Sequence, residues 1–544
     1  MYCANPVDSN YESCGIYIPG KYFDSTLNSN GTYTCTINEN NQVGNYTSKS
    51  APIVMPINTP GYSSCTAPSS NSTDSAKEYT DCGFIYLDAG CRGRDNGAAP
   101  DGVCDLKSAM LLYRFHSDVL AGDSEKIFTF GHSGGGAQSA IMGSSGNSEL
   151  YNPYLESIDS AMISKYGSQL SNAVYGSMCW CPITNLDTAD EAYEWNMGQY
   201  MRSEDSFESS LSDDLSKEYV KYINELNLKD SNSNTLTLEN TTSGSYYDYI
   251  LEVTQNSLNN FLNDTTFPYT PSNNNIQSSN VPAGGEMPNT NNDQSSNVPT
   301  RGEMPNTNND QSGNVPNGSE ILTENNDQTN DNVSTYETAK DYIDSLNSND
   351  TWVEYDESTN TAKITSLEAF VKHCKNPSKS TPAFDDLERS QAENALFGID
   401  SNSSPHFDTT VAELLSNNSD KYSKFSDYSN NYQTEYSNDL KKTDSQNNTI
   451  QTRFDMYNSM YYLCDYYNGS GSSDVAKYWR INTGIEQADT SQCVDVNLYL
   501  AVLSKVGSDN IEFSTVWGSG HTQAERTGNS TSNFINWVNN CCLN

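Results

Sequence analysis

Residues 126–140 read KIFTFGHSGGGAQSA, and they carry the clearest structural signal in the chain. An apolar run of strand length leads into the pentapeptide GHSGG at 131–135, and small residues suited to a helix follow it. Glycines two positions before and after a serine allow the strained strand-to-helix turn that lifts the serine hydroxyl above the edge of a sheet. The segment therefore predicts a nucleophile elbow with Ser133 at its tip.

Glycine-rich turns after a strand also bind phosphate, which gives the motif a second interpretation. The segment lacks the lysine of a GxxxxGK[ST] loop and does not match the GxGxxG pattern of dinucleotide-binding proteins. A purely structural turn is the remaining alternative. We favour the nucleophile because a strand pattern precedes the serine and a helix pattern follows it.

The rest of the chain repeats this alternation of strands and helices. Short apolar runs bounded by proline or glycine, typical of buried strands, occur at 15–19, 51–57 and 83–87, and a helical pattern spans 105–120. Near the end of the chain the same reasoning predicts strands at 478–481 and 511–517 and helices at 494–506 and 533–538. Such alternation favours an α/β fold, in which helices cover both faces of a mainly parallel sheet.

The middle of the chain differs in composition. From 195 to 455 Asn, Ser, Asp and Tyr dominate, with helical patterns at 215–226 and 366–374, which indicates an insertion. We therefore divide the chain into a first core segment at 1–194, a mainly helical lid insertion at 195–455 and a second core segment at 456–544.

A repeat lies inside the insertion. Its copies begin at Ser278 and at Ser295, 17 residues apart, and a decayed third copy begins at Ser312. The copies are polar and contain proline, so they cannot bury enough apolar surface to offset the entropy lost on ordering. We expect residues from about 270 to 335 to be disordered. A folded solenoid is the alternative, but three short copies lack the apolar positions needed to stack.

The charge balance excludes several classes of partner. The 544 residues include 29 Lys and Arg against 70 Asp and Glu, which gives a net charge of −41. Nucleic-acid phosphates and anionic membrane surfaces repel such a chain. Without a membrane-length apolar run or a signal peptide, we expect a soluble protein, cytoplasmic or secreted, of undetermined oligomeric state. Neither a CxxC pair nor a suitable histidine spacing is present, so no metal site is expected.

A nucleophilic serine needs a base, and the chain contains five histidines. Two lie in the insertion, one lies in the helix before the elbow, and His132 lies inside the elbow itself. His521 remains, in a glycine-rich segment that follows the last predicted strand. Because glycines give this loop conformational freedom, we expect it to bring the imidazole of His521 over Ser133.

The acid of a serine triad should follow the penultimate strand, in the chain order serine, acid, histidine. The segment GIEQADT at 484–490 lies there. We expect Asp489 to orient the imidazole, with Glu486 as the alternative. A third interpretation is that Asp489 only caps the helix that begins near Thr490.

An oxyanion hole needs two N–H donors aimed at the charge that develops on the substrate oxygen. One should be the backbone N–H of Gly134, directly after the nucleophile. The other should come from the segment NTPGY at 58–62, which follows the predicted strand at 51–57. Proline has no N–H, so Thr59 or Gly61 would be the donor.

Several motifs together resemble those of one enzyme group. They are NPVD at 5–8, YIP at 17–19, DAGCRGR at 88–94, DLK at 105–107, the elbow with GSSGNS at 143–148, CPITNLD at 181–187, RSQAEN at 389–394 and GHT at 520–522. In this combination the chain resembles the tannase-type and subtype B carboxylesterases of the α/β-hydrolase superfamily.

The resemblance implies an α/β-hydrolase three-layer sandwich with a lid inserted between the sixth and seventh strands. It implies esters of phenolic acids such as gallate, or short acyl esters, as substrates. It also implies the triad Ser133, Asp489 and His521. Two features depart from the group: Gln487 stands where many relatives carry an acid, three residues after Gly484, and the repeat tract looks foreign.

We therefore expect a serine carboxylic-ester hydrolase that forms an acyl-enzyme, needs no cofactor and acts on a small-molecule ester. Candidate substrate contacts in the insertion are Asp386, Arg389 and His406, since phenolic hydroxyls favour polar acceptors beside an aromatic wall. A solvated lid helix is the alternative for these residues. Two other functions stay open: a serine peptidase of the prolyl-oligopeptidase kind, and a catalytically inactive adhesion or binding protein.

Overall fold

A computed structural model describes residues 1–68, 73–202, 204–271, 334–399 and 403–543. The chain is built around a seven-stranded sheet with the strand order β1-β7-β6-β8-β9-β12-β13. β1 pairs antiparallel with β7, and the other neighbours in the sheet run parallel. The strands are β1 (Cys14–Tyr17), β6 (Ile53–Ile57), β7 (Ile85–Ala89), β8 (Ile127–His132), β9 (Gly176–Trp180), β12 (Tyr478–Gly484) and β13 (Ile511–Val516).

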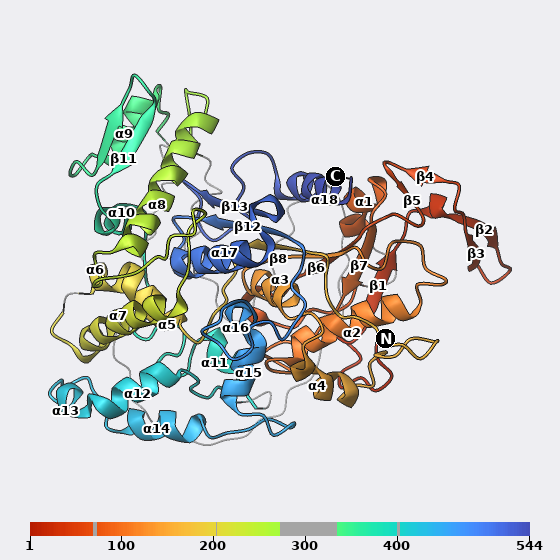
Figure 1. Ribbon diagram of the computed structural model, residues 1–544, viewed down its shortest axis with the longest axis horizontal. Coiled ribbons are helices and arrows are strands. Elements are labelled where there is room, and N and C mark those ends of the chain that lie inside the picture. The colour runs from red at the N-terminus through yellow and green to blue at the C-terminus, as the bar shows by residue number, and fades with distance from the viewer. Residues whose placement is uncertain (69–72, 203, 272–333, 400–402, 544) are drawn as a thin grey trace, which may run out of the picture.

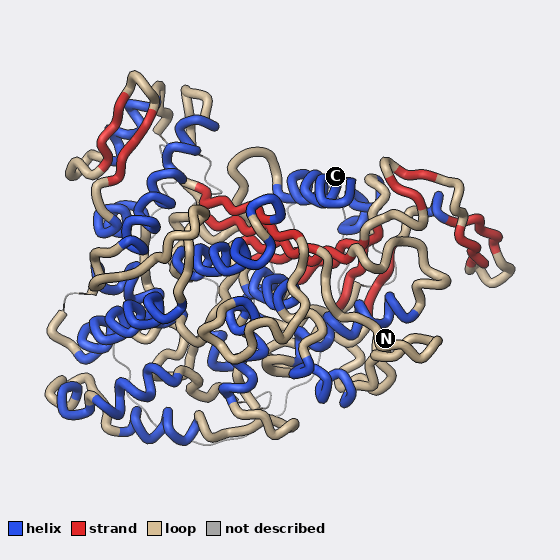
Figure 2. Tube along the Cα trace, in the orientation of Figure 1, coloured by secondary structure: helices blue, strands red, loops and turns tan. Residues whose placement is uncertain are grey.

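Helices cover both faces of this sheet, as the sequence predicts. α1 (Asp74–Asp81) and α18 (Ser530–Leu543) lie on one side, and α2 (Asp101–Phe115), α3 (Gly134–Ser144) and α17 (Gln492–Val506) lie on the other (Figure 1). Figure 2 shows the strands as one continuous band between the two helical layers. Parallel strands are apolar on both faces because both are covered, and β6 is buried along its whole length.

Specific contacts fix each layer to the sheet. On one face the ring of Phe130 in β8 packs against Phe534 of α18, with 4.4 Å between the ring centroids. On the other face Gly143 of α3 lies against Trp479 of β12, where a Cβ atom would sit 2.6 Å from the indole. The second contact holds the last turn of α3, the helix that follows the elbow, against the amino end of β12.

Most predicted core elements are present, with shifted ends. β9 is the strand that the sequence pattern missed. Its sequence GSMCW contains a glycine and a serine, so it does not form an apolar run. In the fold β9 lies between β8 and β12, and Ser177 satisfies its hydroxyl by hydrogen bonding to the backbone oxygen of Ser139 at 2.8 Å.

The segment between β9 and β12 is mainly helical in the residues described, and much of it lies at the left of Figure 1. It contains α5 (Ala189–Tyr193), a π-helical turn (Glu194–Gly198), α6 (Gln199–Met201), α7 (Phe207–Leu226), α8 (Ser245–Asp264), α9 (Ala339–Leu346), α10 (Leu367–Cys374), α11 (Ala392–Leu396), α12 (Thr409–Asn417), α13 (Ser419–Tyr422), α14 (Asn431–Asp439), α15 (Ile450–Tyr457), α16 (Ser459–Leu463) and the hairpin β10 (Val353–Asp356) and β11 (Thr361–Ile364). The domain boundaries at 194/195 and 455/456 stay predictions.

Smaller elements complete the first part of the chain. They are the hairpin β2 (Phe23–Leu27) and β3 (Tyr33–Ile37), the short pair β4 (Gln42–Val43) and β5 (Tyr46–Thr47), and α4 (Asn152–Ser157). The β2–β3 hairpin lies at the opposite end of the molecule from α7 and α12 (Figure 1).

The repeat tract predicted to be disordered, 270–335, lies outside the described residues except at its two ends. There Tyr269 and Tyr336 exchange two backbone hydrogen bonds of 2.8 Å, and the hydroxyls of Thr270 and Thr335 are 2.8 Å apart. The chain therefore leaves and re-enters the described structure at one place.

None of the helices in the described ranges is long and apolar enough to cross a membrane.

A buried ion pair joins the loop after β7 to α2. Arg92 donates to Asp105 from Nη2 at 2.8 Å, from Nε at 3.0 Å and from its backbone N–H at 2.8 Å. Asp105 is fully buried, and the Arg92 side chain is 5% exposed. A charge pair removed from water in this way depends on both partners.

We predict that Asp105→Asn lowers the free energy of unfolding by about 3 kcal/mol, because it leaves the Arg92 charge short of a buried counter-charge. Urea unfolding followed by tryptophan fluorescence measures the change. Glu39→Gln is the control, since Glu39 pairs with Lys49 in solvent, and it should cost less than about 1 kcal/mol. Equal losses in the two variants would contradict the prediction.

Candidate active site

Ser133 lies at the turn between β8 and α3, in the strained conformation that the motif predicts. Its φ is 60° and its ψ is −124°. A Cβ atom on Gly131 would lie 2.3 Å from the carbonyl oxygen of Gly135, and one on Gly135 would lie 2.1 Å from that of Ile57. The flanking glycines are therefore required by close backbone contacts, and they allow the turn to present the Ser133 hydroxyl.

His521 lies in the loop after β13 and faces this serine. Its Nε2 is 2.8 Å from Oγ of Ser133. The loop is held against the end of β12, where the backbone N–H of Glu486 donates to the carbonyl of Ser519 at 3.1 Å. A Cβ atom on Gly484 would lie only 1.9 Å from the carbonyl oxygen of Gly520. The absence of a side chain at 484 thus lets the histidine loop approach.

The second nitrogen of His521 contacts Gln487. Nδ1 of the imidazole is 2.6 Å from Oε1 of the Gln487 amide. Neither carboxylate predicted from the sequence occupies this position. Glu486 instead accepts a hydrogen bond from the backbone N–H of Gly518 at 2.9 Å.

The turn after β12 explains this difference. The backbone N–H of Gln487 donates to the carbonyl of Gly484 at 3.2 Å, which folds the chain back and directs the side chain at 487 toward His521. Asp489 lies two residues further on. Burial raises the pKa of its carboxyl, and the nearby charges of Lys379 and His132 act in the opposite direction.

The imidazole of His521 is held in its neutral form. Burial, and then the positive charge of Lys379, lower the pKa of His521 to about 4. His132 packs against it with 4.7 Å between the ring centroids, and burial lowers the pKa of His132 to about 3. At neutral pH the Nε2 atom of His521 can therefore accept a proton from Ser133.

The residues predicted to form the oxyanion hole come from two segments that lie against each other: the start of α3 and the turn at 58–62. Gly134 is the first residue of this helix, so its N–H has no acceptor within the helix. A Cβ atom on Gly134 would lie 2.6 Å from the carbonyl oxygen of Thr59 and 2.7 Å from the backbone nitrogen of Tyr62. Gly61 lies in the same short turn with a φ of 55°. The segment at 58–62 therefore contacts the elbow, and the roles of its N–H groups stay a prediction.

Comparison with known proteins identifies the fold. The BD-FAE family model matches residues 42–232. The structure of a tannase from Fusobacterium nucleatum has a TM-score of 0.66 and 25% identity over 99% of this chain and 93% of that chain. The native tannin acyl hydrolase from Lactobacillus plantarum has a TM-score of 0.64 and 21% identity over 99% and 92%. No match was found among curated proteins.

The chain has an α/β-hydrolase fold. These matches confirm the predicted fold class, and they support an ester-hydrolysing enzyme of the tannase type.

His406, a predicted substrate contact in the insertion, is held by internal partners. It is fully buried, its Nδ1 lies 2.8 Å from Oδ1 of Asp385, and its ring stacks on Tyr436 with 3.6 Å between the centroids. These contacts give His406 a structural role in the insertion, and a substrate contact there stays a prediction.

The other two predicted contacts also have partners within the insertion. Oδ1 of Asp386 accepts a hydrogen bond from the backbone N–H of Ser390 at 2.7 Å. Nε of Arg389 donates to Oδ2 of Asp439 at 3.0 Å. The structure brings neither side chain into hydrogen-bond contact with Ser133, so their substrate role likewise stays a prediction.

One group of side chains in the described residues could offer three metal ligands. The ligand atoms of His132, Cys181 and His521 lie within 4.8 Å of one another. Burial raises the pKa of the Cys181 thiol to about 12, which opposes thiolate formation. Both nitrogens of His521 are already hydrogen bonded. The group therefore fits a catalytic arrangement better than a metal site.

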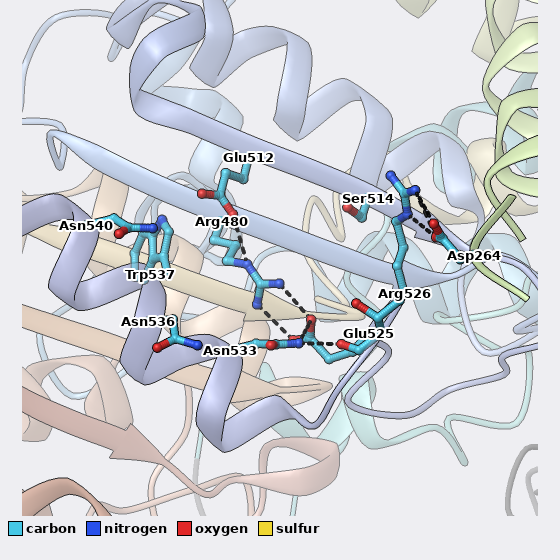
Figure 3. A pocket seen from close by; sticks show the side chains of 11 residues that line it. Asp264, Arg480, Glu512, Ser514, Glu525, Arg526, Asn533, Asn536, Trp537 and Asn540 are labelled. Atoms are coloured by element: carbon cyan, nitrogen blue, oxygen red, sulfur yellow. Dashed lines mark hydrogen bonds and ion pairs between the residues drawn. The ribbon is translucent and has the colours of Figure 1, made fainter. Parts of the chain in front are cut away.

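A polar pocket of about 350 Å³ lies between β13, α18 and the later part of the loop that joins them (Figure 3). Arg480 pairs there with Glu525 at 2.6 Å and with Glu512 at 3.1 Å. Arg526 pairs with Asp264 at 2.8 Å. The pocket thus holds three carboxylates against two guanidinium groups, and each of these charged side chains already has a partner.

We predict that Gly484→Ala slows the reaction of Ser133 with a fluorophosphonate probe by about 100-fold, because the added methyl displaces the loop that carries His521. Intact-mass spectrometry follows the labelling over time. Gly20→Ala is the matched control, since nothing lies within 4 Å of a Cβ atom at that position. Labelling of the Gly484→Ala variant at the parent rate would show that the loop tolerates the side chain.

Proposed function

We propose that this protein is a serine hydrolase of carboxylic esters that acts on small esters of phenolic or short acyl acids. The observation that carries the proposal is the hydrogen-bonded series Ser133, His521 and Gln487, with distances of 2.8 Å and 2.6 Å. It has the spacing of a nucleophile, a base and an orienting group.

The geometry supports an acyl-enzyme mechanism. Nε2 of His521 takes the proton of the Ser133 hydroxyl as Oγ bonds to the ester carbonyl carbon. The N–H of Gly134 and one from the segment at 58–62 stabilise the resulting oxyanion. The imidazolium then protonates the departing alcohol, and the carbon–oxygen bond to it breaks. Water deacylates Ser133 by the same steps, with His521 again as the base.

Two observations favour phenolic esters among the possible substrates. Structures of tannin acyl hydrolase, 22% identical to this chain, contain 3,4-dihydroxybenzoate in one case and ethyl gallate in another. In this chain Lys379 and Asp489 lie close enough to influence the pKa values of the site. A cation and a carboxyl close enough to act on the imidazoles of the site suit the recognition of acidic phenolic hydroxyls. We therefore assign Asp489 and Lys379 to the polar end of the substrate.

A substrate panel tests the function. We expect hydrolysis of methyl gallate, methyl ferulate or 4-nitrophenyl acetate, and loss of at least about 10³-fold in kcat for Ser133→Ala, which removes the nucleophile. A proline-containing peptide amide belongs in the panel, since cleavage of the amide alone would identify a peptidase. Intact Ser133 after treatment with a fluorophosphonate, in folded protein, would favour the inactive binding protein.

Asp489→Asn separates the two roles considered for that residue. Because Asp489 does not contact His521, we predict that this variant keeps kcat for 4-nitrophenyl acetate within about tenfold and raises KM for methyl gallate more strongly. Steady-state kinetics on both esters measure the difference. A loss of about 10⁴-fold on both esters, the size expected for the orienting acid of a triad, would return Asp489 to that role.

A further inference from the structure

The amide of Gln487 can face His521 in two orientations, whereas a carboxylate is the same in both. A carboxylate only accepts hydrogen bonds, so it fixes the proton of its histidine on Nδ1. An amide can present either its oxygen or its NH₂ group, and the NH₂ group would force the proton onto Nε2, where the imidazole could no longer act as a base toward Ser133. The group behind Gln487 must therefore determine which way the amide faces.

The structure places hydrogen-bond acceptors behind this amide. Nε2 of Gln487 donates to Oγ1 of Thr483 at 2.6 Å and lies 3.5 Å from Oδ2 of Asp495. The hydroxyl of Thr483 donates a hydrogen bond to Sγ of Cys181, 3.8 Å away, and its oxygen can therefore accept one from Gln487. With acceptors on this side, the amide oxygen faces His521.

Among Thr483, Cys181 and Asp495, only Asp495 is a carboxyl group. It is fully buried, in the first turn of α17, where the helix dipole favours an anion. Its Oδ1 has no hydrogen-bond partner among the described residues. Burial raises its pKa to about 8, while an interaction with the Thr483 side chain and then the Lys375 ammonium act in the opposite direction. In either protonation state Oδ2 retains a lone pair for the amide.

Lys375 fixes the other end of Gln487. Its Nζ donates to the backbone carbonyl of Gln487 at 2.6 Å, so both the main chain and the side chain of this residue are held. Gln487 is itself only 2% exposed. The series from Asp495 to Ser133 therefore lies in a region where hydrogen bonds are stronger than in water.

We propose that Asp495 is a positioning residue that acts through the Gln487 amide, in place of the carboxylate that this chain lacks beside His521. It orients the amide so that the base-competent tautomer forms, because its Oδ2 lies on the NH₂ side of the amide and leaves the amide oxygen to face His521. This inference rests on the proposed function. The 3.5 Å contact shortens as the imidazolium forms, since catalytic hydrogen bonds tighten in the reacting complex.

The test compares the parent with Asp495→Asn and with a double variant that exchanges the two groups, Gln487→Glu with Asp495→Asn. We expect Asp495→Asn to lower kcat for 4-nitrophenyl acetate by about 10- to 100-fold, the size typical of outer-shell partners, with KM within about twofold. The exchange returns a carboxylate directly to His521, so it should recover kcat to within about tenfold of the parent. Asp509→Asn, an exposed change of the same kind, should leave the kinetics unchanged.

Two kinetic outcomes would overturn the inference. Asp495→Asn with parent kcat would show that Asp495 does not act on the triad. An exchanged variant as slow as Asp495→Asn, with the same thermal unfolding midpoint as the parent, would show that a carboxylate beside His521 does not replace Asp495. If Asp495→Asn does not fold, the tautomer of His521 in the parent still tests the inference.

A spectroscopic measurement separates this inference from the proposed function. With ¹⁵N-labelled histidine, the five imidazoles of the chain can be titrated by NMR and His521 assigned by substitution. We expect the Nδ1–H tautomer for His521 in the parent and a higher His521 pKa in the exchanged variant. A parent without esterase activity would count against the proposed function alone. An Nε2–H tautomer in the parent would overturn the role given to Asp495.

Discussion

The strained backbone at Ser133 is the constraint on which the rest of the site depends. A φ of 60° with a ψ of −124° is a conformation that residues with a side chain rarely adopt, and it persists only where surrounding structure holds it. Here the N–H of Ser133 donates to the carbonyl of Trp180 in β9 at 3.0 Å, and its carbonyl accepts from Ala137 in α3 at 2.9 Å. The central strands and the first turn of α3 thus fix the position of the hydroxyl.

The histidine loop is fixed by a second backbone approach, at Gly484. The loops after β12 and β13 are joined by hydrogen bonds from Ile485 to Val516 and from Glu486 to Ser519, each 3.1 Å long. The loop that carries His521 and the loop that carries Gln487 are therefore linked directly to each other. In this arrangement a neutral amide lies beside His521, at the place where the resemblance implies a carboxylate.

The sequence predicted the parts of this site that depend on local pattern. The elbow follows from glycine spacing around Ser133, and His521 follows from its place after the last strand. The partner of His521 depends on one turn after β12, in which neighbouring residues point in different directions. The backbone conformation of that turn decides whether residue 486, 487 or 489 reaches the imidazole. Hydrophobic periodicity does not predict this conformation.

The insertion and β9 were difficult to predict for a related reason. The Ser177 hydroxyl interrupts the apolar pattern of β9, yet a buried hydrogen bond to α3 satisfies it. His406 is a polar side chain of the kind expected to contact a substrate. Its stacking on Tyr436, which belongs to α14, could be seen only in three dimensions. Contacts with residues far away in the sequence determine the surroundings of Ser177 and His406. The local sequence pattern does not reveal such contacts.

Burial, and then the charge of Lys379, give His521 a low proton affinity, and the neutral amide of Gln487 does not counter them as a carboxylate would. A carboxylate beside an imidazole raises its pKa, whereas burial lowers that of His521 to about 4. Compared with an ordinary histidine, forming the imidazolium is harder by about 3 kcal/mol. Groups that act only when charge has developed must offset this difference. In the mechanism proposed above, the N–H of Gly134 stabilises the oxyanion, and Asp495 keeps the amide oxygen of Gln487 turned toward the imidazolium.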